Sequence, residues 1–123
     1  MSALSEAYTY LTSDVTLMGY LTGGVSSIWN MEDRSFPRVI LGFNGNRIDD
    51  VMRGGNITVD LFYNSNAIQT ASTIRDLIAG ILQVDVMDNA LRLNLEADGI
   101  VKDNDPQIGH WSMLFSIREV RSV

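Results

Sequence analysis

The amino-acid sequence predicts an α+β fold in one domain, residues 1–123, with a mostly antiparallel sheet of about four to five strands. Residues 57–63 place apolar side chains at every second position, the pattern of a strand with one buried face. Residues 67–82 then place apolar side chains at helical spacing. Further alternating segments follow near the C-terminus. We therefore expect the long helix to pack on one face of the sheet, with another helix at the N-terminus.

The N-terminal part of the chain predicts two helical segments. Residues 3–12 have helical spacing, with one apolar face formed by Leu4, Ala7, Tyr8 and Leu11. Asp14 stands where an N-cap is needed for a short second helix, which Gly23 and Gly24 end.

Strands are predicted at residues 25–29 and 38–43, the second of them led by Pro37. Residues 44–55 are the longest irregular stretch between strong elements, so we expect a hairpin with a long loop there. The next strand begins near Asn56.

The second half of the chain predicts one helix and two strands. Ser65 and Asn66 are the N-cap candidates for the helix at 67–82. Strands are then expected at 90–96 and 110–120, separated by a polar loop at 98–109.

Composition limits the class of protein. With 46% hydrophobic and 20% charged residues, a chain of 123 residues can bury one core. It has no cysteine, so disulfides, thiolate metal sites and cysteine nucleophiles are excluded. No membrane span or signal peptide is recognised, and we expect synthesis in the host cytoplasm. The net charge of −6, with Lys102 as the one lysine, disfavours tight nucleic-acid binding.

Residues for catalysis, cofactors or metals are not recognisable in the sequence. His110 is the only histidine and is interpreted as a surface or edge-strand residue. The acidic set Asp98, Asp103 and Asp105 lacks the glycine and glutamate spacing of a calcium loop, so a solvated turn is expected. Asp49 and Asp50 are likewise interpreted as part of a solvated loop. We expect no enzyme activity, no cofactor and no metal.

Phe62 is the unusual residue of the strand at 57–63, because it lies on the face opposite to Ile57, Val59 and Leu61. An apolar residue on the second face indicates that this face is also covered. We expect a neighbouring subunit to cover it.

The order of elements resembles the tail terminator family of long-tailed bacteriophages, also called tail-completion or head–tail joining proteins. The resemblance runs from about Leu4 to Val120 through GVSSIW, PRVILGF, GGNITVDLFYNSNAIQTASTIRDLI and HWSMLFSIREV. It implies a virion structural protein that forms a homo-oligomeric ring, typically a hexamer. The ring would cap the completed tail tube and dock to the head connector, with DNA passing through its lumen.

The resemblance implies no catalytic residues, and it assigns none to the lumen, the tube or the connector. The predicted assembly surface is the loop formed by Arg47, Ile48, Asp49, Asp50, Val51, Met52 and Arg53. A surface loop without a special role is the alternative.

Two other functions remain open at this point. A head-completion or neck protein of the same assembly would have a similar sequence pattern. A small-molecule-binding module or enzyme could instead use one face of the last strand, formed by His110, Ser112, Ser116 and Arg118.

Overall fold

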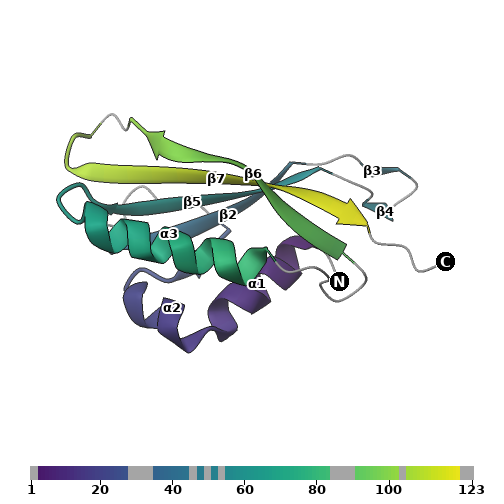
Figure 1. Ribbon diagram of the computed structural model, residues 1–123, viewed down its shortest axis with the longest axis horizontal. Coiled ribbons are helices and arrows are strands. Elements are labelled where there is room, and N and C mark those ends of the chain that lie inside the picture. The colour runs from purple at the N-terminus through teal and green to yellow at the C-terminus, as the bar shows by residue number, and fades with distance from the viewer. Residues whose placement is uncertain are drawn as a thin grey trace.

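The computed structural model describes residues 3–27, 35–44, 47–48, 51–52, 55–83, 91–102 and 105–119. A five-stranded sheet forms one layer, and the helices form a second layer on one side of it (Figure 1). The elements are α1 (Ala3–Ser13), α2 (Val15–Tyr20), β1 (Val25–Ser26), β2 (Arg38–Asn44), β3 (Arg47–Ile48), β4 (Val51–Met52), β5 (Asn56–Asn64), α3 (Ile68–Leu82), β6 (Leu91–Val101) and β7 (Ile108–Glu119). The predicted α+β class is confirmed.

The strand order in the large sheet is β1-β2-β5-β7-β6. The pairs β2–β5, β5–β7 and β6–β7 are antiparallel, and only β1 runs parallel to its neighbour β2. The expectation of a mostly antiparallel sheet is therefore confirmed. Strands β5 and β7 are central, whereas β1 and β6 form the two edges.

The core lies between α3 and the central strands. The alternating residues of β5 face the helices and are buried, as are Met113 and Phe115 of β7. Helix α3 meets them with a stripe of buried residues: Ala71, Ile74, Ile78, Ala79 and Leu82. The period of two in β5 and the helical period in α3 thus place their apolar faces against each other.

The N-terminal helices follow the sequence closely. The backbone N–H of Leu17 donates to the Asp14 carboxylate at 2.9 Å, so the predicted N-cap of α2 is confirmed. On α1, Ala7 and Leu11 are fully buried against the core, whereas Tyr8 is 46% exposed. Tyr8 therefore lies at the margin of the buried face.

The expected N-cap of α3 is wrong. Ala67 occupies the N-cap position and makes no side-chain cap hydrogen bond. Ser65 and Asn66 lie instead in a turn, which the Ala67 N–H closes by donating to the Asn64 carbonyl at 2.8 Å. The Ser65 N–H also donates to the Gln107 carbonyl at 3.0 Å, which ties this turn to the start of β7.

The expected polar loop at 98–109 is also wrong at both of its ends, over half of its length. Strand β6 continues to Val101 and β7 already begins at Ile108. A β-bulge between Leu95 and Ala97 shifts the register, so that Asp98 and Ile100 lie opposite Met113 and Trp111. The extra residue interrupts the alternation on which the sequence prediction depended.

Two other expectations are confirmed only in part. Within the described residues, the strand expected at 25–29 comprises Val25–Ser26 and is followed by a bend at Ser27, whereas Trp29 lies outside the described residues. Within the long loop after β2, the short strands β3 and β4 pair as an antiparallel hairpin (Figure 1).

A glycine in β7 provides a test of the packing. A Cβ added at Gly109 would lie 2.2–2.6 Å from ring carbons of Tyr63, which is only 2% exposed and has little room to move. Gly109→Ala should lower the free energy of unfolding by about 1–3 kcal/mol in urea titrations. The control is Gly99→Ala in the adjacent strand, where nothing lies within 4 Å of the added methyl group. Equal stability of both variants would contradict this packing.

Candidate assembly surfaces

The sheet face opposite to the helices presents a cluster of three side chains from β5 and β7. Phe62 and His110 are direct cross-strand partners, and their rings stack with centroids 4.3 Å apart and an interplanar angle of 19°. The His110 Nε2 atom lies 2.7 Å from an Asp60 carboxylate oxygen. The carboxylate thereby holds the ring in place over Phe62.

This cluster revises two interpretations of the sequence. His110 lies in a central strand, so its interpretation as an edge-strand residue is wrong. Phe62 does lie on the second face, but it is only 7% exposed within the subunit. Its role at a subunit interface stays a prediction, and little of the Phe62 side chain is left for such a contact.

On the helix side, Arg75 connects α3 to the edge strand β6. An Arg75 guanidinium nitrogen lies 2.5 Å from one Asp98 carboxylate oxygen, and the Trp111 indole N–H donates to the other at 3.1 Å. These hydrogen bonds, foremost the one from Arg75, lower the pKa of Asp98. The hydrogen bond with Asp98 in turn raises the pKa of Arg75.

The interpretation of Asp98 as part of an acidic turn is therefore wrong, although the residue is exposed to solvent, as that interpretation expected. It is a strand residue that accepts two hydrogen bonds from other elements. Asp103 lies outside the described residues. Among the residues that the structure does describe, no group of three His, Cys, Asp or Glu could hold a metal ion.

Three exposed apolar residues gather where α3 begins and β6 ends. Ile68, Ile100 and Val101 are 40%, 63% and 42% exposed, and all three border one shallow hollow beside Lys102 and Asp105. We call these three residues the apolar ridge. Ile100 and Val101 are consecutive in an edge strand, so they project from its two opposite faces.

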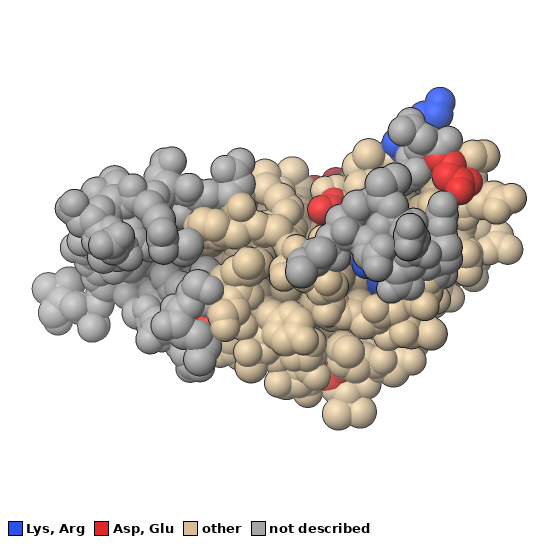
Figure 2. Space-filling model, turned by 180° about the vertical axis from the view of Figure 1, so that it is seen from behind, with Lys and Arg blue, Asp and Glu red and all other residues tan. Residues whose placement is uncertain are grey.

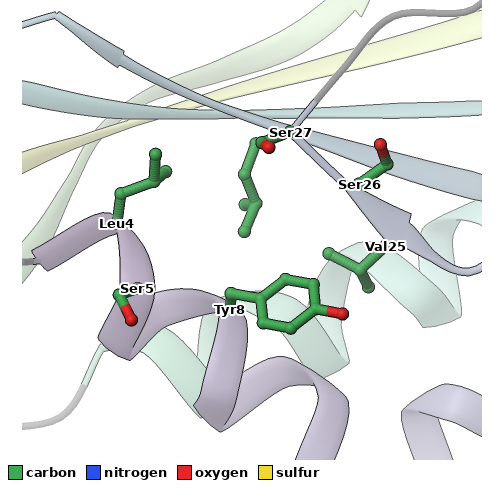
Figure 3. A pocket seen from close by; sticks show the side chains of 7 residues that line it. Leu4, Ser5, Tyr8, Val25, Ser26 and Ser27 are labelled. Carbon is green, nitrogen blue, oxygen red and sulfur yellow. The ribbon is translucent and has the colours of Figure 1, made fainter.

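A groove lies at the other edge of the sheet, between α1 and β1 (Figure 3). Leu4 and Tyr8 approach it from the helix, and Val25 and Ser26 from the strand. Ser5, Ser27 and the buried Leu41 complete the described lining, which encloses about 450 Å³. We call this hollow the edge groove.

Charged side chains are sparse over the described part of the surface that Figure 2 shows, and most of this part is uncharged. Neutralisation of nucleic-acid phosphates requires clustered Lys and Arg, and no such cluster is visible there. None of the described helices is long and apolar enough to cross a membrane.

The predicted assembly loop is described only in part. The backbone of Arg47–Ile48 and of Val51–Met52 forms the β3–β4 hairpin. Asp49, Asp50 and Arg53 lie outside the described residues. The role of this loop in assembly stays a prediction.

Comparison with known proteins identifies a solved structure that has the same fold. No family model matches the chain, and no curated protein matches its sequence. Among solved structures, the chain is similar to one in the virion of a native gene transfer agent particle, with a TM-score of 0.76. The match covers 95% of this chain and 93% of the other, at 14% sequence identity. The two chains share a fold.

Two features of these surfaces have no recognisable signal in the sequence. Arg75 and Asp98 are 23 positions apart, and their contact depends on how α3 crosses the sheet. The apolar ridge likewise combines residues from α3 and β6 that no short motif connects.

The low pKa of Asp98 predicts a dependence of stability on pH. Because its pKa in the folded protein lies below the ordinary 3.8, ionised Asp98 stabilises the fold above that pH. This contribution is lost as the pH falls through the lowered pKa. Asp98→Asn should therefore cost about 1 kcal/mol at neutral pH, and the difference from wild type should vanish in strong acid.

The matched control is Asp76→Asn. Asp76 also pairs with Arg75, at 3.0 Å, but its side chain is 69% exposed. We expect a change within about 0.5 kcal/mol for this variant. Urea titrations at a series of pH values compare the two, and equal losses at neutral pH would contradict the assigned role of Asp98.

Proposed function

We propose that this protein is a structural component of a virion. The observation that supports this most strongly is the shared fold with a chain of a gene transfer agent virion over nearly the full length of both chains. The resemblance of the sequence to tail terminators points to the same class of protein. Two independent comparisons, one of sequence pattern and one of coordinates, thus favour a role in virion assembly.

Within that class, the function we propose is that of a tail terminator. Copies of the chain form a ring, hexameric in the family it resembles, which caps the completed tail tube and joins the tail to the head connector. The net charge of −6 suits a ring through which DNA passes without being tightly bound. The loop at 47–53, which includes the β3–β4 hairpin, is the proposed contact with neighbouring proteins.

A non-enzymatic role agrees with the hydrogen bonds that polar side chains form on the sheet face opposite to the helices. The His110 ring is held by Asp60, and the Ser116 hydroxyl donates to the Glu96 carboxylate at 2.6 Å. Two of the candidate polar residues of β7, His110 and Ser116, are thus engaged in pairs within the sheet.

Light scattering across a range of concentrations, combined with negative-stain imaging, tests the proposed ring. We expect closed rings about as wide as a tail tube. A strict monomer at every concentration would contradict the ring. Binding of the rings to purified tail tubes, and not only to head connectors, would separate a terminator from a head-completion or neck protein.

Replacement of residues 47–53 by a short Gly-Ser linker tests the assembly loop. The large sheet does not include β3 or β4, so the thermal unfolding of the monomer should change little. Ring formation or binding to tail tubes should be lost. The control is Val15→Ser on α2, a residue 86% exposed, which should leave assembly intact. Full assembly of the linker variant would show that the loop has no such role.

A further inference from the structure

The hollow beside the apolar ridge has the size and lining of a small-ligand site. It encloses about 530 Å³, and such sites typically measure about 300–1,000 Å³. Ile68, Ile100 and Ile108 line it from the start of α3, the end of β6 and the start of β7. A few polar groups border the same space, foremost Tyr63 and Lys102. An apolar wall with a few converging polar groups is the usual composition of a ligand site.

The Tyr63 hydroxyl is the unusual polar group of this hollow. The residue is only 2% exposed, yet its hydroxyl forms no hydrogen bond with any described residue. Burial alone raises the pKa of the phenol. The ring lies across Gly109, where the missing side chain leaves room for the ring carbon that bears the hydroxyl. Because a buried hydroxyl without a partner lowers stability, this group calls for a partner from outside the chain.

Lys102 adds a positive charge to the hollow. It is exposed directly after the end of β6, and it forms no ion pair with any described residue. Asp105 also borders the hollow, but its carboxylate accepts the Gln107 N–H at 2.9 Å within its own turn. The His110 ring is likewise held by Asp60. The Lys102 ammonium group and the Tyr63 hydroxyl are thus both available to donate hydrogen bonds to a ligand.

We propose that this hollow binds a small molecule with an apolar body and one carboxylate group. The apolar body contacts Ile68, Ile100 and Ile108, and the carboxylate accepts hydrogen bonds from Lys102 and Tyr63. A charge-assisted hydrogen bond is about twice as strong as a neutral one, so an anionic acceptor fits these donors better than a neutral one. The site lies within one subunit, and the inference therefore does not depend on the proposed ring.

Hexanoate and hexan-1-ol form a matched pair of probes, because they share the apolar chain and differ in the carboxylate. Saturation-transfer NMR titrations with the full chain measure the affinity of each. We expect saturable binding of hexanoate with a dissociation constant of about 1 mM. Hexan-1-ol should bind about fivefold more weakly or worse. Hexanoate that does not bind saturably would overturn the site, and equal affinities of the two probes would overturn the recognition of a carboxylate.

Two variants locate the probe in the hollow. Tyr63→Phe and Lys102→Gln each remove one donor, so each should weaken hexanoate binding about fivefold, and Lys102→Gln should leave hexan-1-ol binding unchanged. Tyr63→Phe should not lower the melting temperature in circular dichroism, because the hydroxyl it removes has no described partner. The control is Tyr20→Phe on α2, which removes a phenol hydroxyl from a residue that is 40% exposed and does not line the hollow. Hexanoate binding that neither variant weakens would overturn the assignment to this hollow.

The outcomes separate this inference from the proposed function. Rings that bind no hexanoate would overturn the ligand site and leave the proposed ring standing. Monomers that bind hexanoate through Tyr63 and Lys102 would support the ligand site and contradict only the ring.

Discussion

The packing of α3 across β5 and β7 is the constraint on which the rest of the structure depends. Ile74 and Ile78 of the helix and Val59 and Phe115 of the strands are all fully buried. Because α3 covers the central strands, the other two helices can pack on this face of the sheet only beside α3. The N-terminal helices lie beside α3 on the same face of the sheet (Figure 1).

The sequence predicted those elements whose pattern is local. The alternation at 57–63 and the helical spacing at 67–82 depend on neighbouring residues, and both were confirmed. The extension of β6 could not be predicted, because a bulge interrupts its alternation. Asp98 is held there by Arg75 from a distant part of the chain. The prediction of the N-cap of α3 was wrong for a similar reason, because the turn before the helix is held by a hydrogen bond to Gln107.

The candidate surfaces were less predictable than the fold. The sequence placed Phe62 on the second face of the sheet correctly, but its burial beneath the His110 ring depends on cross-strand register. The ridge and the groove each combine residues from a helix and a strand, so only the folded chain brings them together. At 14% identity, the likeness to a virion chain is equally invisible in short motifs, because packing conserves a fold through many substitutions.

The two edges of the sheet differ greatly in length, with two residues in β1 and eleven in β6. If the two unlike edges meet in the proposed ring, the contact is head-to-tail, and all copies then point the same way around the axis. The upper and lower rims of such a ring are then chemically distinct. One rim can be selected for a tube and the other for a different partner, which gives a direction to whatever is built on it.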